Sequence, residues 1–193
     1  MSSNNRKVLI KVFVLLFIIA ILFVWRIFSG YSDSSSVKKD HYLLRFNLNE
    51  LEPGEARIVH HNGLPVVLMH RTEQELKELL AIRSSLSDPD SKQSWQPNFA
   101  KNYHRSLKSE YFIAYAMTPS SGLAINYRLK SFKTNLSSVG QWYGGFSETR
   151  NSLLFDKAGR SYTQGSVNLD VPNYKITPQN QLYVYTLKEL DFD

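Results

Sequence analysis

An apolar segment near the N-terminus limits what the rest of this chain can form. Residues 8–28 read VLIKVFVLLFIIAILFVWRIF, and an uninterrupted apolar run extends from Val12 to Trp25. As a helix rising about 1.5 Å per residue, this segment is about 31 Å long, which matches the hydrocarbon core of a bilayer. Lys11 and Arg26 directly flank the apolar run, where their long side chains can reach the membrane interface. The segment therefore predicts a single transmembrane helix over residues 8–28.

A cleaved signal peptide would also contain an apolar run of this length. Cleavage requires small residues directly after the run, whereas residues 25–28 are Trp, Arg, Ile and Phe. We therefore predict an uncleaved anchor. Arg6, Lys7 and Lys11 flank its start, so the positive-inside rule places residues 1–7 in the cytoplasm. The rest of the chain is then expected on the opposite side, which is the periplasmic side of the inner membrane if the cell is bacterial.

The segment after the anchor has a different composition. Residues 29–40, SGYSDSSSVKKD, are rich in serine and almost free of apolar side chains, which predicts a flexible tether. Residues 41–193 remain, and a segment of this length forms one domain of ordinary size.

Short β-type segments separated by turn residues fill most of residues 41–193. The longer expected strands are 42–51, 56–61, 64–70, 111–117 and 123–129, and the shorter ones are 161–163, 167–171 and 182–186. The polar stretch 84–110 is expected to be a loop. Short antiparallel strands at close spacing predict a small sandwich or barrel. The expected fold class is therefore mostly β, a small antiparallel β-sandwich with one short helix, preceded by the N-terminal helix.

Two local signals in this domain are strong. Asn62-Gly63 lies between the runs ARIVHH and LPVVLMH, and both turn residues tolerate positive φ, which predicts a tight hairpin. Thr72 and Glu75 form a capping-box pattern ahead of Leu76, Leu79 and Leu80. A helix is therefore expected over residues 72–83.

The hairpin and helix together resemble the opening of the Rieske iron–sulfur proteins of cytochrome bc complexes. In residues 51–79, Gly63 and Pro65 match the family's Gly-x-Pro turn. The following strand ends in His70-Arg71-Thr72 and leads into a short helix, as in the family. An N-terminal anchor followed by a hinge also fits. The resemblance implies a Rieske-like domain over residues 41–193.

A second stretch strengthens the resemblance, which covers nearly the whole chain. Residues 144–160, GGFSETRNSLLFDKAGR, resemble the second loop that holds the family's iron–sulfur cluster. The residues that follow this loop include Asn168-Leu169 and Val171-Pro172, pairs that also occur in the family. The family's proline-rich covering loop is shortened here to GSVN at residues 165–168.

The resemblance fails at the cluster site. The family holds a two-iron, two-sulfur cluster with two Cys and two His from two loops, which a disulfide joins. This sequence contains no cysteine. The ligand positions are occupied by Met117, Pro119, Glu148 and Asn151, and the disulfide positions by Leu123 and Arg150. One carboxylate beside proline, a thioether and a neutral amide cannot hold such a cluster.

We therefore predict no metal, no cofactor, and no catalytic or cofactor-binding residues. The two loops need other support if the cross-link is absent. We expect apolar contacts to supply it, from Met117, Leu123, Leu153, Leu154 and Phe155. Glu148 is expected to be solvated or loosely paired with Arg150.

Other residues that could carry chemistry give weak signals. His60 and His61 are adjacent on an expected strand, so they point to opposite faces and cannot chelate one ion. GFSET at 145–149 resembles a nucleophile elbow but ends in Thr where Gly is needed. The sequon Asn135-Leu136-Ser137 is informative only for a secreted eukaryotic chain.

A basic cluster is opposed only by Glu110, and its members are Lys101, Arg105, Lys108, Arg128, Lys130 and Lys133. Two interpretations remain open, a solvated face or a surface that contacts an acidic partner or lipid headgroups. Nucleic acid is not expected as a partner, because the anchor places the domain outside the cytoplasm.

The chain retains the sequence pattern of the family but lacks the residues that bind the cluster. This combination predicts a non-catalytic structural or accessory subunit. Its expected partners are the lipid bilayer and the membrane-embedded subunits of a respiratory complex of cytochrome bc or oxidase type. The alternative is an electron-transfer subunit or enzyme that uses another centre, in a ubiquinol–cytochrome c reductase role.

Overall fold

The structure, a computed structural model, describes residues 11–14, 16–25, 42–61, 63–133, 141–150 and 152–185. The chain divides into two units, Met1–Asp40 and His41–Asp193. The tether predicted at 29–40 and the sequon at 135–137 lie outside the described residues.

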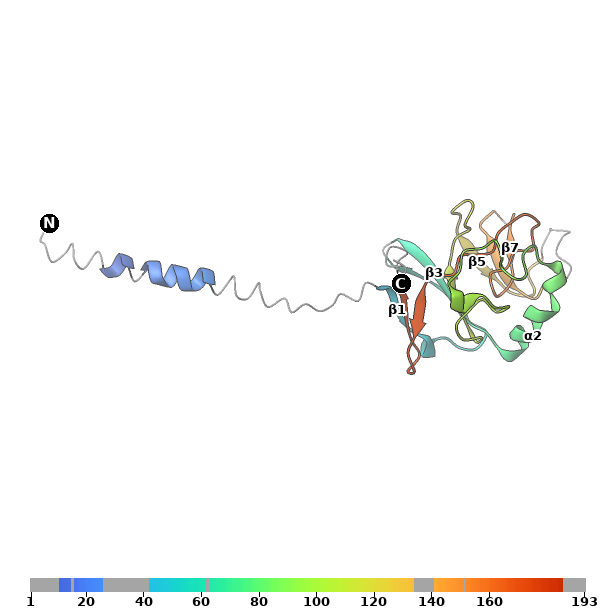
Figure 1. The fold of residues 1–193 in the computed structure, drawn as a ribbon, viewed down its shortest axis with the longest axis horizontal. Coiled ribbons are helices and arrows are strands. Elements are labelled where there is room, and N and C mark those ends of the chain that lie inside the picture. Colours follow the sequence, from blue (N-terminus) through green and yellow to red (C-terminus); the bar gives the residue numbers. More distant parts are fainter. Residues whose placement is uncertain are drawn as a thin grey trace, which may run out of the picture. The chain divides into compact units, whose positions relative to one another are not determined.

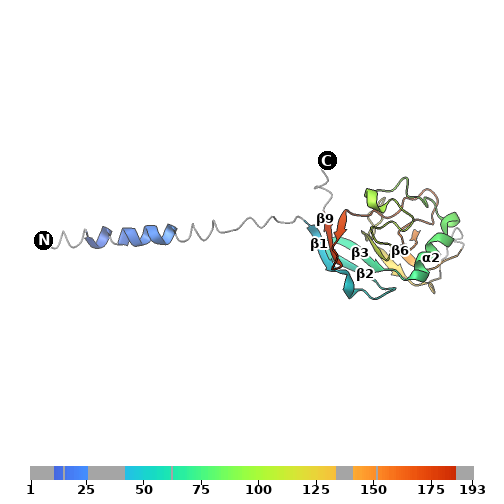
Figure 2. The same ribbon diagram turned by 60° about the horizontal axis from the view of Figure 1, so that its bottom comes forward.

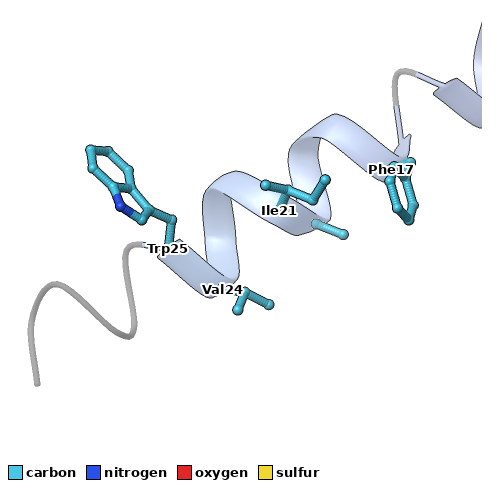
Figure 3. Close-up of a pocket in the computed structure, with 5 residues that line it drawn as sticks. Phe17, Ile21, Val24 and Trp25 are labelled. Atoms are coloured by element: carbon cyan, nitrogen blue, oxygen red, sulfur yellow. The ribbon is translucent and has the colours of Figure 1, made fainter.

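The first unit contains a helix, described over residues 11–14 and 16–25. Its apolar side chains are exposed, and Figure 3 shows Phe17, Ile21, Val24 and Trp25 standing out from the helix. No helix within the described residues is both long enough and apolar enough to cross a membrane. Part of the predicted span, 8–28, lies outside these residues.

Within its described residues, the second unit contains three small antiparallel sheets and one α-helix (Figures 1 and 2), so the mostly β prediction is confirmed. The first sheet has the order β1-β9-β8, the second β2-β3-β4 and the third β5-β6-β7. In chain order the strands are β1 (Tyr42–Asn47), β2 (Ala56–His61), β3 (Leu64–His70), β4 (Tyr111–Tyr115), β5 (Ile125–Arg128), β6 (Gly145–Glu148), β7 (Leu154–Phe155), β8 (Tyr174–Ile176) and β9 (Gln181–Tyr185).

The hairpin between β2 and β3 forms as predicted, with His61 opposite Leu64 and Gly63 at a φ of 80°. β3 is the central strand of its sheet, because its other edge pairs with β4. Residues 66–69 of β3 are fully buried, which explains why the strand reads as a continuous apolar run instead of an alternating one.

The α-helix, α2 (Glu73–Ala81), begins with the predicted capping box. The Thr72 hydroxyl accepts a hydrogen bond from the Glu75 amide at 3.2 Å, and the Glu75 carboxylate accepts one from the Thr72 amide at 2.8 Å. Leu79 is buried, but Leu80 is half exposed, so the buried face is narrower than predicted. The helix also ends before Arg83, where the 3-10 turn η2 (Arg83–Ser85) begins.

Several predicted strands are shorter than expected or absent. Residues 48–50 leave β1 as the 3-10 turn η1 (Leu48–Glu50). Another 3-10 turn, η3 (Asn98–Ala100), interrupts the long loop. Residues 167–171 form no strand, because their amides bond to scattered partners such as the Gly159 carbonyl. Of 161–163, only Ser161 forms a bridge, with Phe155.

β6, β7 and β8 were not predicted, because each strand is too short to show an alternating pattern.

A main hydrophobic core draws buried residues from all three sheets, including Leu44, Val67, Ile113, Phe146 and Val184. A second apolar cluster contains Ile82, Leu86, Trp142, Leu154 and Tyr162. The third sheet contributes to both, with Phe146 in the first and Leu154 in the second. The third sheet therefore connects the two apolar clusters.

Replacing Thr72 by Ala tests the capping box. The change removes the side-chain acceptor for the Glu75 amide, so we expect a loss of about 1 kcal/mol in the free energy of unfolding. Chemical denaturation of the purified chain measures this loss. Gln74→Ala, at an exposed position of the same helix, serves as the control and should change stability by less than about 0.5 kcal/mol. Equal effects of the two changes would contradict a stabilising cap.

Candidate functional site

The two loops of the expected cluster site connect strands of the second and third sheets. The first loop, residues 116–124, joins β4 to β5 and is closed by Thr118. The Thr118 amide donates to the Leu123 carbonyl at 2.9 Å, and its hydroxyl accepts from the Leu123 amide at 3.1 Å. The Thr118 hydroxyl also lies 2.6 Å from that of Ser121. The buried Thr118 therefore holds this loop without a cross-link.

The second loop, predicted over residues 144–160, contains β6 and β7 in the structure, and the connection between these two strands lies beside the first loop. The Thr149 amide donates to the Ala124 carbonyl at 2.9 Å, and Glu148 pairs with Ile125 across β6 and β5. The structure thus brings the two predicted loops together. Asn151, one of the predicted ligand positions, lies outside the described residues.

The side chains at the other ligand positions do not fit an iron–sulfur cluster. Met117 is half-buried, and Pro119 is exposed and has no donor atom. Glu148 is buried, with only 3% exposure, and accepts a hydrogen bond from the Ser152 hydroxyl at 3.0 Å. Within the described residues, no three His, Cys, Asp or Glu side chains gather closely enough to hold a metal ion. No thiolate is present in the sequence to replace them.

Two expectations about these loops need correction. Glu148 is not solvated, because β6 is buried along its whole length, and Arg150 is exposed. The apolar filling is also uneven. Leu154 and Phe155 are buried, but Met117, Leu123 and Leu153 are only half-buried. The strand residues therefore carry the packing, and the loop tips do not.

The glycine pair Gly144-Gly145 serves packing of the chain against itself. Gly145 has a φ of 151°, and a β-carbon there would collide with the carbonyl oxygen of Phe155. Glycine is therefore needed so that β6 can approach the backbone of β7.

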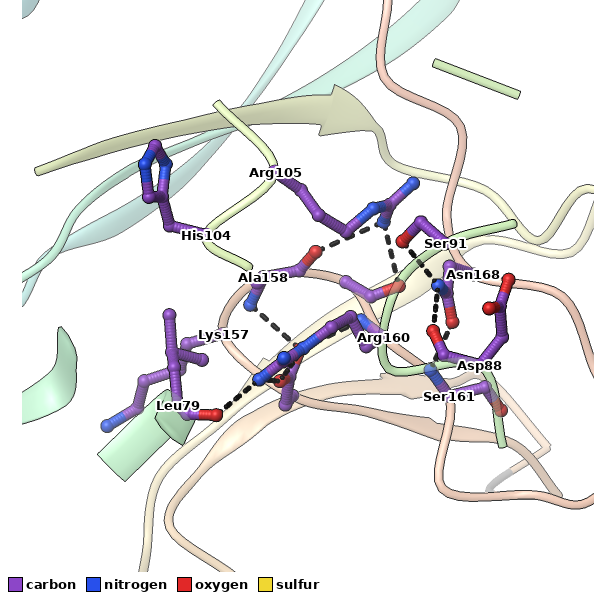
Figure 4. A network of polar contacts seen from close by, with 12 residues as sticks. Leu79, Asp88, Ser91, His104, Arg105, Lys157, Ala158, Arg160, Ser161 and Asn168 are labelled. Carbon is purple, nitrogen blue, oxygen red and sulfur yellow. Dashed lines mark hydrogen bonds and ion pairs between the residues drawn. The ribbon is translucent and has the colours of Figure 1, made fainter. Parts of the chain in front are cut away.

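After β7, the turn at residues 156–160 is built around the buried carboxylate of Asp156. Figure 4 shows Lys157, Ala158 and Arg160 of this turn together with Leu79 and Arg105. One oxygen of Asp156 accepts hydrogen bonds from the amides of Ala158 at 2.9 Å and Arg160 at 2.8 Å. The other oxygen accepts from the Arg160 side chain at 2.8 Å. The Arg160 guanidinium also donates to the Leu79 carbonyl at 2.6 Å, which ties the turn to α2.

Two further buried arginines reach the same turn. Arg105 donates to the carbonyls of Ala158 at 3.1 Å and Gly159 at 3.2 Å, and also to the Leu169 carbonyl at 2.6 Å. Arg71 donates to the Lys157 carbonyl at 3.4 Å. Arg71, Arg105 and Arg160, here called the arginine clamp, are each at most 2% exposed. Burial lowers the pKa of Arg71 and of Arg105 to about 10, which leaves both side chains charged near neutral pH.

Lys157 forms a second link between this turn and α2. Its ammonium lies 2.8 Å from the Glu75 carboxylate and 3.4 Å from that of Glu78, and all three side chains are largely buried. The turn is therefore held by guanidinium groups and by a lysine paired with the helix.

The polar pair His104 and Ser106 lies beside Arg71 but cannot act as a base and nucleophile. The Ser106 hydroxyl is fully buried, donates to the Lys108 carbonyl and accepts from Arg71. Burial, reinforced by the charge of Arg71, lowers the pKa of His104 to about 4. Ser147 of the GFSET motif is also fully buried, and its hydroxyl accepts from Arg128 at 2.8 Å. Neither serine can meet a substrate.

The structure also shows where the adjacent histidines and the basic cluster lie. His60 and His61 are both exposed at the end of β2. Arg105 belongs to the arginine clamp, so it is not part of an exposed basic face. Lys130 lies 3.7 Å from Glu78, and Lys101 and Lys133 are exposed. The sequence could not separate Arg105 from its exposed neighbours, because its partners lie far along the chain.

Comparison with known proteins identifies the class to which these loops and sheets correspond. No family model matches the chain. It is 31% identical over 134 residues to the ubiquinol–cytochrome c reductase iron-sulfur subunit of Allochromatium vinosum. This alignment covers 69% of the chain and 62% of that subunit, so the chain spans less than two thirds of its relative. The chain is therefore a homologue of the Rieske iron–sulfur subunits, and the resemblance found in the sequence is confirmed.

A solved structure described as a hyperthermophilic respiratory Complex III contains a chain with a TM-score of 0.43 and 10% identity. The alignment covers 90% of this chain and 97% of that one.

Replacing Arg105 by Lys tests the arginine clamp. Lysine keeps the charge but cannot reproduce a fork that donates to three carbonyls, so we expect a loss of about 3 kcal/mol or more in the free energy of unfolding. Arg83→Lys is the matched control. Arg83 is exposed and pairs with Asp90 on the surface, so its replacement should cost less than about 0.5 kcal/mol. Urea denaturation of both variants provides the measurement, and comparable losses would contradict a structural role for Arg105.

Alanine substitutions at Phe155, Leu123 and Glu148 test the packing of the two loops. Phe155→Ala removes a fully buried ring and should cost about 3–5 kcal/mol, whereas the half-buried Leu123 should cost less than about 2 kcal/mol. Glu148→Ala removes a buried side chain and its hydrogen bond from the exposed Ser152 hydroxyl, which water can then satisfy, and should cost about 0.5–1.5 kcal/mol. Denaturation midpoints give the order. An unchanged stability for Glu148→Ala would show that this carboxylate is solvated.

Proposed function

We propose that this chain is a non-catalytic structural or accessory subunit of a membrane respiratory complex. One observation carries the proposal. The two loops of a Rieske-type site lie together on intact sheets, while their ligand positions hold side chains that cannot bind the family's cluster. Binding to a partner is the best explanation for a domain that keeps these loops and sheets but lacks the cluster ligands.

The proposed partners are the membrane-embedded subunits of a complex of cytochrome bc or oxidase type. Support comes from the homology to a reductase subunit and from the position of the folded unit after an apolar segment. In this proposal residues 8–28 anchor the chain as a single-pass helix, and residues 29–40 tether the domain. At about 3.3 Å per residue the tether reaches about 40 Å when fully extended, which is enough to contact a neighbouring subunit.

The orientation follows from the charges around the anchor. Arg6, Lys7 and Lys11 favour a cytoplasmic N-terminus, so the domain would lie on the periplasmic or an equivalent side. In that location the domain can reach the bilayer surface and the exposed parts of membrane proteins, but not nucleic acid.

Purification of the tagged full chain from its native membrane in mild detergent tests this function. We expect cytochrome or oxidase subunits to co-purify in fixed proportion, as identified by mass spectrometry. Recovery of the chain alone would overturn the proposal. Metal analysis and a visible absorption spectrum of the isolated chain test the alternative of another redox centre. A stoichiometric metal or a chromophore would favour electron transfer over a purely structural role.

A further inference from the structure

A hollow of about 280 Å³ opens beside the first loop. Its walls include Leu64 at the start of β3, Tyr115 at the end of β4, and Met117 and Pro119 of the loop. Asp170, from the segment that follows residues 165–168, contributes the acidic group of an otherwise mainly apolar lining. The main chain joins these elements, because the Tyr115 amide donates to the Asp170 carbonyl at 2.9 Å.

The carboxylate of Asp170 has no ion pair with any Lys, Arg or His in the described part of the chain. Burial raises its pKa above the usual range, although Arg105 and the Trp95 amide oppose this shift. Arg105 cannot turn toward it without losing hydrogen bonds to Gln96 and to three carbonyl groups. A cation placed next to a half-buried carboxylate of this kind interacts with it more strongly than with an exposed carboxylate, because water screens the charges less.

Tyr115 adds a second polar group to the hollow. Burial raises the pKa of its phenol, and the charge of Asp170 raises it further. The phenol therefore stays protonated near neutral pH, and its oxygen can accept a hydrogen bond from a cation held by Asp170.

We propose that this hollow receives one lysine or arginine side chain of the protein partner. The inference rests on the proposed function and names the chemistry by which the partner is recognised. The aliphatic stem of the incoming side chain would lie against Leu64 and Met117, and its charged end would reach Asp170 and Tyr115. The volume lies just below the range of about 300–1,000 Å³ that is usual for small-molecule sites, so it suits one side chain better than a cofactor.

The partner fits a general pattern of protein interfaces. Arginine is enriched in their buried centres, where one side chain that fills a pocket dominates affinity. Charge complementarity at such a point also selects against partners that present an acidic or neutral group.

The test is co-purification of the partner from the native membrane with four tagged forms of the full chain. These forms are wild type, Asp170→Asn, Pro119→Trp and Glu52→Gln. Asp170→Asn keeps the shape of the side chain and removes its charge. Pro119→Trp partly fills the hollow from an exposed position and leaves Asp170 unchanged. Glu52→Gln, at an exposed acid of another turn, is the control. Melting temperatures identify any variant that is misfolded.

We expect Asp170→Asn and Pro119→Trp each to lower the recovered partner subunits at least about tenfold, and Glu52→Gln to leave recovery unchanged. If Asp170→Asn destabilises the chain, Pro119→Trp decides alone. Normal recovery with every folded variant would overturn this inference but leave the proposed function intact. Failure of the wild type to recover any partner would overturn the proposed function itself.

A structure of the captured wild-type complex gives the direct readout. A lysine or arginine of the partner within ion-pair distance of Asp170 would establish the contact. An empty hollow, an apolar side chain or a lipid in it would overturn the inference.

Discussion

The rest of the domain depends on three buried guanidinium groups that satisfy main-chain carbonyls. Arg71, Arg105 and Arg160 converge on the turn at 156–160, where Asp156 is the carboxylate that ion-pairs with one of them. Buried carbonyls in irregular segments have no strand or helix partner and must be satisfied in another way. One guanidinium carries five donors in a rigid fork, so it can serve several carbonyls at once. The clamp therefore joins segments far apart in the sequence without a disulfide.

This arrangement explains how the two-loop frame can persist without a cluster. The clamped turn follows β7 directly, β7 pairs with β6, and both strands belong to the second loop. The first loop is closed by its own Thr118 and joined to the second loop through the Thr149 amide. Each support is a hydrogen bond or a buried side chain that needs neither metal nor thiol. The ligand positions at 117 and 119 lie on the less buried tip of this frame, so their side chains can change at little cost to the core.

The features that the sequence predicted well are local. The Asn62-Gly63 turn and the Thr72 capping box depend on residues within a few positions of each other, and both flanking elements form as expected. The missed features depend on distant partners. Arg105 reads as one more basic residue, yet its acceptors Ala158 and Leu169 lie 53 and 64 positions away. Glu148 reads as a surface acid and is buried, because only the pairing of β6 with β5 and β7 shows that this short strand is internal.

The charged residues are distributed unevenly between the two parts of the chain. Residues 1–40 contain six Lys or Arg and two Asp, while the remaining residues contain 17 basic and 15 acidic side chains. Most of the net charge of +6 therefore belongs to residues 1–40, which contain the apolar segment. The folded domain is close to neutral, and part of its basic charge is buried in the clamp. Long-range electrostatic attraction is weak for a domain with a net charge this close to zero, so the partner that we propose would be selected by local contacts, such as one with Asp170 in the hollow beside the first loop.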